Sequence, residues 1–159
     1  SAYLLLFNLV SAAGWAFIAL TTFRAYGEGL SAGELWDVVG QALVIVQSMA
    51  FMEVVHSAVG LVRSPVATTA LQVASRLLLV WGYSKPFPEC QQHWSLYLMV
   101  GSWALVEVPR YLFYAFNLYM TTVPFVLHFL RYNLFMALYP SGITGEMMQM
   151  YTALGPLYT

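Results

Sequence analysis

A tyrosine and a glutamate seven residues apart, Tyr139 and Glu146, are the residues of this chain best suited to proton transfer. Between them stand Pro140, Ser141 and Gly142, which predict a turn between a helix that ends at the tyrosine and a helix that the carboxylate opens. A phenol and a carboxyl on either side of a tight turn could act as an acid–base pair. On spacing alone, however, an interfacial tyrosine and a helix-capping glutamate explain the pattern better.

Five further ionisable residues lie in otherwise apolar stretches, namely Glu53, Arg76, Glu107, Arg110 and Arg131. An unpaired charge near the centre of a bilayer costs roughly 2.5–3.5 kcal/mol on insertion scales. Together with Glu146 the set contains three acids and three bases, so complete pairing inside a helix bundle is possible. For any single residue, a simple inter-helix ion pair is an equal alternative. The set as a whole predicts one polar chamber, which Tyr139 and Glu146 also reach.

The histidines and the one cysteine indicate little additional chemistry. His56 and His128 stand in different apolar stretches and could in principle bind haem or a metal ion. A histidine three residues from Glu53 is more often a hydrogen-bonded interior residue, which is what we expect of His56. Cys90 has no basic cluster around it and is expected to be inert, and a single cysteine excludes a disulfide framework or a Cys-x-x-Cys site.

The elements that must position these side chains are membrane helices. Of 159 residues, 60% are hydrophobic and only 8% are charged, whereas a soluble domain carries roughly 25% charged residues. This composition and the net charge of -1 exclude a soluble globular domain, a disordered chain and a basic nucleic-acid-binding protein. We predict an all-α, polytopic transmembrane helix bundle that forms a single domain over residues 1–159.

About 20 residues are needed to cross the apolar core of a bilayer. Charged residues, prolines and glycines divide the chain into five stretches of this order, at Tyr3–Phe23, Val38–Val62, Val66–Tyr83, Trp94–Tyr119 and Phe125–Tyr139. A further helix is expected at Ile143–Leu154, which is too short to cross.

Five motifs carry a resemblance to a known family. They are YLLLFNLVSAAGW at Tyr3–Trp15, EVVHSAVGLVRSP at Glu53–Pro65, QVASR at Gln72–Arg76, EVPRYLFY at Glu107–Tyr114 and RYNLFMALYPSGITGE at Arg131–Glu146. In this order they resemble the very-long-chain (3R)-3-hydroxyacyl-CoA dehydratases of the endoplasmic reticulum, also called protein-tyrosine-phosphatase-like A proteins.

The resemblance implies a multi-pass enzyme of the endoplasmic reticulum membrane with six spans, which converts a very-long-chain 3-hydroxyacyl-CoA to the trans-2-enoyl-CoA. This is the third step of fatty-acid elongation, so the implied partners are the substrate, the lipid bilayer, and the condensing enzyme and reductases of the cycle. The family's catalytic tyrosine and glutamate fall on Tyr139 and Glu146, and its accompanying polar residues on Glu53, Arg76, Glu107, Arg110 and Arg131. No metal and no organic cofactor are implied. Residue types leave open which member of the pair is base and which is acid; we favour Glu146 as base.

The chain also departs from the family pattern. It ends at Thr159, before the segment that would form the sixth span, so we expect the sequence to be trimmed there. Pro109 separates Glu107 from Arg110, and no arginine follows Cys90 at the spacing of a phosphatase loop. The remaining alternatives are a catalytically inactive scaffold of the elongation machinery, a haem-binding membrane subunit, and a transporter.

Overall fold

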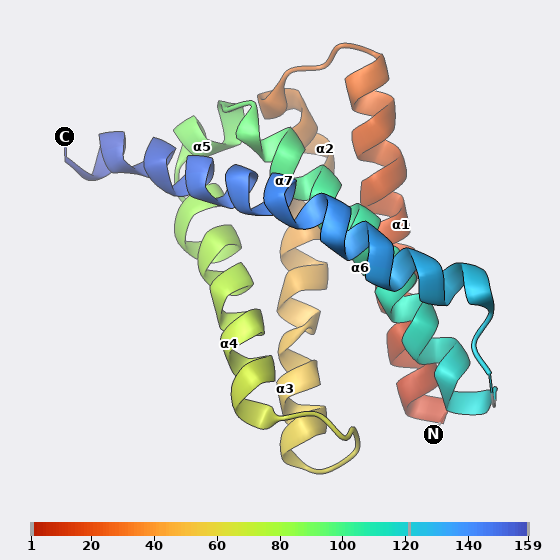
Figure 1. Cartoon of the computed structure of the whole chain (residues 1–159). Coiled ribbons are helices and arrows are strands. Elements are labelled where there is room, and N and C mark those ends of the chain that lie inside the picture. Colours follow the sequence, from red (N-terminus) through yellow and green to blue (C-terminus); the bar gives the residue numbers. More distant parts are fainter. Residues whose placement is uncertain (1, 121, 159) are drawn as a thin grey trace.

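The structure of the chain is a computed structural model that describes residues 2–120 and 122–158, except for the side chains of residues 135 and 157. Residues 1, 121 and 159, which include both ends of the predicted domain, lie outside this description. The described residues form helices and no strand, which confirms the all-α class (Figure 1). The helices are α1 (Ala2–Gly27), α2 (Ala32–Met49), α3 (Phe51–Ala58), α4 (Val66–Leu77), η1 (Leu78–Ser84), α5 (Pro88–Gln92), α6 (Ser95–Tyr119) and α7 (Phe125–Leu157).

Two helical stretches of the described chain, Ala2–Gly27 and Ala32–Ala58, are long and apolar enough to cross a membrane. They correspond to the first two predicted spans, and the second contains a break at Ala50 between α2 and α3. The third predicted span becomes α4 followed by the π-helical turn η1, and the fourth becomes α6. The number of five spans therefore stays a prediction.

The connections between the first helices follow from local sequence. Ser31 caps α2, because its hydroxyl accepts from the backbone N–H of Glu34 at 3.2 Å and the Glu34 carboxylate accepts from the Ser31 N–H at 2.7 Å. At the end of α3, Gly60 has a φ of 80°, a conformation that costs a glycine little. The chain then reverses into α4, so α3 and α4 lie side by side (Figure 1).

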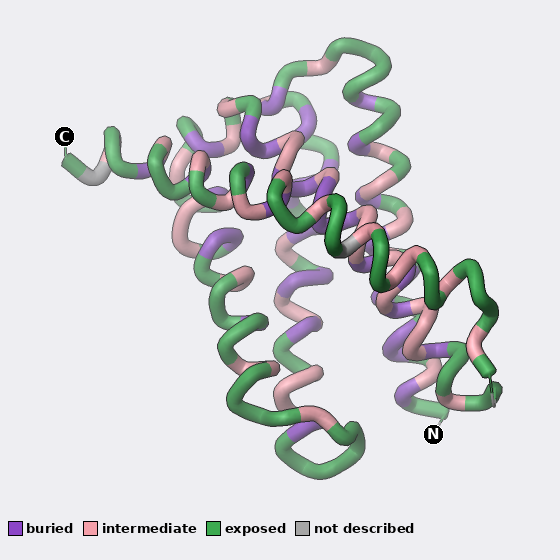
Figure 2. The backbone as a smooth tube through the Cα atoms, in the orientation of Figure 1, coloured by how far each residue is buried: buried purple, intermediate pink, exposed green. Residues whose placement is uncertain are grey.

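The core is centred on α6, which packs against α1 on one side and α7 on the other. Fully buried side chains include Trp15 and Ile18 of α1, Leu43 of α2, and Leu96 and Met99 of α6. Figure 2 shows that buried positions follow α6 and the helix faces turned towards it, whereas α4 is mostly exposed. Side chains that contact α6 therefore lie in the most buried part of the molecule.

The C-terminal helix corrects one prediction. α7 runs without interruption from Phe125 to Leu157, so the expected turn at Pro140–Gly142 and the separate helices at Phe125–Tyr139 and Ile143–Leu154 are wrong. Proline in a helix interior removes one backbone donor and usually kinks or ends the helix. Here the helix continues through the proline, and two hydroxyls add bonds to the backbone around it: Ser141 Oγ donates to the Leu138 carbonyl at 2.9 Å and Thr144 Oγ1 donates to the Pro140 carbonyl at 2.8 Å.

In this segment Gly145 allows close packing rather than a turn. A Cβ atom at Gly145 would lie 2.7 Å from the backbone nitrogen of Met99, and one at Gly142 would lie 3.7 Å from Ser102 Cβ. Without a side chain at Gly145, the backbone of α7 approaches α6 closely. In Figure 1 α7 crosses the bundle at a steep angle to α3 and α4.

Candidate active site

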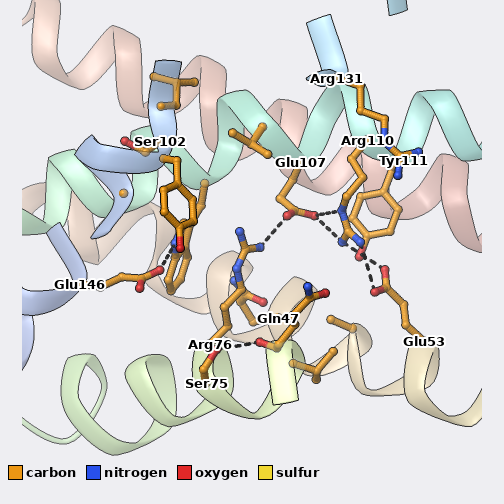
Figure 3. Close-up of a pocket in the computed structure, with 18 of the residues that line it drawn as sticks. Gln47, Glu53, Ser75, Arg76, Ser102, Glu107, Arg110, Tyr111, Arg131 and Glu146 are labelled. Carbon is orange, nitrogen blue, oxygen red and sulfur yellow. Dashed lines mark hydrogen bonds and ion pairs between the residues drawn. The ribbon is translucent and has the colours of Figure 1, made fainter. Parts of the chain in front are cut away.

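A cavity of about 690 Å³ opens between α2, α3, α4, α6 and α7. All seven residues selected from the sequence line it, namely Glu53, Arg76, Glu107, Arg110, Arg131, Tyr139 and Glu146. Figure 3 labels all of them except Tyr139 and shows these side chains directed into the space between the helices, with Glu107 near the centre and Glu146 towards one end. The structure thus brings these residues, which come from four helices, to one site.

A continuous chain of ion pairs crosses the cavity. Arg76 Nη1 donates to Glu107 Oε1 at 2.6 Å, and Arg110 donates to Glu107 Oε2 from Nη2 at 2.6 Å and from Nε at 2.9 Å. Arg110 also donates to both oxygens of Glu53, at 3.2 and 3.4 Å. These four residues form what we call the ion chain. Pro109 lies inside α6 and does not disrupt the Glu107–Arg110 pair.

Burial makes Glu107 the critical member of the ion chain, because its carboxylate is nearly inaccessible to solvent and is shared by two arginines. Taking a charge out of water is costly unless partners surround it, and removing one partner leaves the others unpaired. Two guanidinium groups against two carboxylates make the chain neutral as a unit. This arrangement explains how several charges are tolerated between apolar helices.

Arg131 lies near Arg110, at the end of the cavity away from Glu146, and is held mainly by aromatic rings. Its guanidinium carbon is 4.4 Å from the ring centre of Phe113 and 4.7 Å from that of Tyr114, and Nη2 donates to the Tyr114 hydroxyl at 3.4 Å. Within residues 2–120 and 122–158 it forms no ion pair with a carboxylate. Its positive charge is therefore available to balance a further anion in the cavity.

Tyr139 and Glu146 lie on the same face of α7 because seven residues correspond to two helical turns. The sequence-based argument that Glu146 opens a helix is wrong, so the helix dipole does not act on its carboxylate in the way expected. Glu146 Oε1 instead accepts a hydrogen bond of 2.8 Å from the indole Nε1 of Trp103 on α6. The Tyr139 side chain remains about half exposed at the cavity wall.

Trp103 and Gln47 are two further buried residues that line the same cavity; Gln47 was expected from the sequence to be an interior hydrogen-bonding residue, whereas sequence reasoning missed Trp103. Trp103 precedes Glu107 by four residues and therefore shares its helix face, which is a signal that could have been used. Gln47 Nε2 is buried and has no hydrogen-bond partner within the described part of the chain. In Figure 3 the Gln47 amide points towards the ion chain.

The histidine and cysteine side chains are engaged elsewhere. His56 is buried and its Nε2 lies 2.8 Å from the Tyr3 hydroxyl, as expected of an interior hydrogen-bonded histidine. Cys90 is buried against α7, and burial, followed by the nearby charge of Glu89, raises the pKa of its thiol to about 11. The protonated thiol is a poor nucleophile at neutral pH. Across the described ranges, no three His, Cys, Asp or Glu side chains are grouped so as to hold a metal ion.

Comparison with known proteins points to a single family. Residues 47–159 match the family model described as protein tyrosine phosphatase-like protein, PTPLA. The chain is 39% identical over 154 residues to very-long-chain (3R)-3-hydroxyacyl-CoA dehydratase 2 of Mus musculus, a match that covers 97% of this chain and 60% of the relative.

Two further relatives come from distant organisms. The dehydratase of the same description called hpo-8 in Caenorhabditis elegans is 39% identical over 96% of this chain and 70% of its own length. The one called PASTICCINO 2 in Arabidopsis thaliana is 39% identical over 99% of this chain and 71% of its own length. The chain thus spans about three fifths to seven tenths of these relatives. No solved structure matches it.

Proposed function

The chain belongs to the protein tyrosine phosphatase-like (PTPLA) family, and from this premise we propose that it removes water from a very-long-chain (3R)-3-hydroxyacyl-CoA to give the trans-2-enoyl-CoA. The observation that carries the proposal is the position of Tyr139 and Glu146, which share one face of α7 and line the cavity that holds the ion chain. A phenol and a carboxyl at one wall of a polar cavity are suited to proton transfer.

The proposed reaction needs one base and one acid. Glu146 takes the proton from the carbon next to the thioester, and the electrons of that C–H bond form the new carbon–carbon double bond. The C–O bond at the third carbon breaks, its electrons leave with oxygen, and Tyr139 supplies the proton that turns the departing hydroxide into water. Return of the proton from Glu146 to the tyrosinate, directly or through solvent, restores the enzyme.

The ion chain contributes a fixed electrostatic environment in this mechanism. Its charges are paired before substrate binds, so they do not reorganise during proton transfer. Arg131 has no carboxylate partner among the described residues, and it stands fifteen residues before Glu146 on α7, about 22 Å along the helix. It can therefore balance negative charge carried by the CoA phosphates at a distance from the reacting thioester. A polar cavity between apolar helices also suits a substrate with a charged CoA end and a long apolar chain.

The setting that fits this activity is a lipid bilayer. The two apolar helical stretches at Ala2–Gly27 and Ala32–Ala58 support a membrane protein. We propose that the full-length protein is a single multi-pass domain of the endoplasmic reticulum membrane, with the six spans of its family, and that it performs the third step of fatty-acid elongation beside the condensing enzyme and the reductases.

The test is turnover of a very-long-chain (3R)-3-hydroxyacyl-CoA by the purified full-length protein, with the enoyl-CoA product identified by mass spectrometry. Tyr139→Phe removes one oxygen and keeps the ring, and Glu146→Gln keeps the side-chain shape. Loss of a general acid or base typically lowers the rate by roughly 10²–10⁴-fold, and we expect both variants to fall in or beyond this range. Because the two residues act as one unit, the double variant should be hardly slower than the slower single variant.

Matched controls separate chemistry from folding. Tyr151→Phe removes the same oxygen from an exposed tyrosine of α7, and Glu28→Gln changes an exposed carboxylate at the end of α1; both should keep full turnover. If either active-site variant retains more than about a tenth of the normal rate, a barrier change of only about 1.4 kcal/mol, that residue is not part of the mechanism. A wild-type protein without dehydratase activity would favour the inactive scaffold.

A further inference from the structure

Trp103 connects the ion chain to the proposed base. Its indole Nε1–H donates to Glu146 Oε1 at 2.8 Å, and the guanidinium carbon of Arg76 lies 5.0 Å from the centre of its ring. We propose that Trp103 is a positioning residue, which holds the Glu146 carboxylate in the orientation needed to abstract a proton and couples that orientation to the ion chain. This inference rests on the proposed dehydratase function.

The chemistry of the indole suits such a role. An indole nitrogen donates one hydrogen bond and accepts none, so it can orient a carboxylate without competing for the proton that the carboxylate takes up. Hydrogen bonds to a charged acceptor are shorter and stronger than neutral ones, so this contact restrains a side chain that otherwise has several rotamers. Trp103 is only 3% exposed, and its own position is therefore fixed by packing in α6.

The ring is also held from its face. A cation over an indole is attracted by the ring, and the planar guanidinium of arginine stacks on it well. Arg76 is itself bound to Glu107 at 2.6 Å, and Glu107 is bound to Arg110. Figure 3 shows Arg76 between Glu146 on one side and Glu107 on the other. Trp103 is thus the contact at which α4, α6 and α7 meet beside the proposed base.

Two variants remove the N–H donor. Trp103→Phe removes it together with part of the side chain and keeps a ring for Arg76. Incorporation of 3-benzothienylalanine at position 103 is the decisive variant, because it keeps the full shape of the side chain and replaces only the N–H group, with sulfur. A hydrogen bond to a charged group is strong enough that its loss should lower kcat roughly 10–100-fold. KM for the 3-hydroxyacyl-CoA should stay within about twofold, because the lost contact is made to the carboxylate rather than to the substrate.

A double-mutant cycle distinguishes this role from a structural one. In the Glu146→Gln background the carboxylate is absent, so replacing Trp103 should cost less than about twofold in the residual rate. The control is Trp94→Phe, at a half-exposed tryptophan just before α6 that lies outside the cavity, and it should keep full turnover.

Three results would overturn the inference. They are an unchanged kcat for the 3-benzothienylalanine variant, a loss confined to KM, and the same loss of rate with and without the Glu146 carboxylate. These failures are distinct from failure of the proposed function, since they are measured against a wild-type protein that turns over substrate. An inactive wild-type protein would refute the function itself and the inference with it.

Discussion

Replacement of Gly145 by alanine is the most direct test of how α7 is held against α6. The new Cβ would lie 2.7 Å from the Met99 nitrogen, 2.9 Å from its Cα and 3.0 Å from its Cβ, and two of these three atoms belong to the backbone of α6. A flexible side chain could move aside, but a helix backbone cannot do so locally. To bring the nitrogen contact to 3.4 Å, α7 must move away from α6 by about 0.7 Å.

The cost of this movement follows from two opposing effects. Overpacking of a close contact typically costs about 1–3 kcal/mol, whereas alanine is favoured over glycine in a helix by about 1 kcal/mol. Gly155→Ala in the same helix provides the reference, because among the described residues outside its own stretch of helix no heavy atom lies within 4 Å of the Cβ that it would add. The propensity gain is largest inside a helix and smaller at Gly155 in the last turn, so we expect Gly145→Ala to be less stable than Gly155→Ala by up to about 3 kcal/mol.

Activity should fall for a geometric reason. Glu146 is the next residue, and a displacement of about 0.7 Å would stretch its 2.8 Å bond to Trp103 to the limit of a hydrogen bond. Misplacement of about 1 Å at a catalytic group can cost on the order of 10²-fold in rate. Unfolding free energies in detergent and kcat would be measured for both variants and for Gly142→Ala, whose added Cβ makes an ordinary 3.7 Å contact. If Gly145→Ala matches Gly155→Ala in stability and keeps wild-type turnover, the close approach of α7 and α6 does not position the site.

Two further predictions concern the ion chain and the cysteine. Glu107→Gln should lower the unfolding free energy by about 3–5 kcal/mol, because it removes the buried carboxylate shared by two partly buried guanidinium groups, of which Arg76 loses its ion pair and Arg110 keeps only Glu53. Glu28→Gln breaks an exposed pair and should leave the unfolding midpoint unchanged, so equal midpoints for the two variants would contradict the structural role of Glu107. The raised pKa of Cys90, about 11 against an ordinary value of 9.0, keeps the folded thiol protonated, so the stability it contributes is complete below pH 9 and is lost as the pH rises towards 11. Alkylation of the folded protein by iodoacetamide should accordingly be slow at pH 8 and fast only after unfolding, and rapid labelling of the folded protein at pH 8 would show that the thiol is accessible.

The parts of the site that could be predicted from sequence are those that depend on short-range spacing. Glu107 and Arg110 are three residues apart, and their pairing on one helix face needed no knowledge of the fold. Charges in apolar stretches need partners, so their convergence followed from the same physical requirement. Their exact pairing did not follow, because Glu53 binds Arg110 from another helix rather than the neighbouring His56. Which carboxylate pairs with which arginine depends on how the helices pack.

The course of α7 could not be predicted from its own residues. Proline and glycine in Pro140–Gly142 are typical of a turn, and only the contact with α6 shows that Gly145 is required as a packing site. Ser141 and Thr144, whose hydroxyls bond to the backbone beside Pro140, are residue types that give only a weak indication of a continuous helix. Trp103 was overlooked because an interior tryptophan in a hydrophobic helix is usually part of the core, and its donor function depends on a residue 43 positions away.

The ion chain also has a consequence for the order in which the protein can be assembled. Glu53 and Arg76 belong to α3 and α4, whereas their partners Arg110 and Glu107 both belong to α6, which leaves the ribosome later. Until α6 arrives, the first helices carry charges that lipid does not solvate, so they must remain beside water or the insertion machinery. Arrival of one helix then neutralises both charges at once. We therefore expect the ion chain to form only after α6 has been synthesised, whatever the first helices have packed before it.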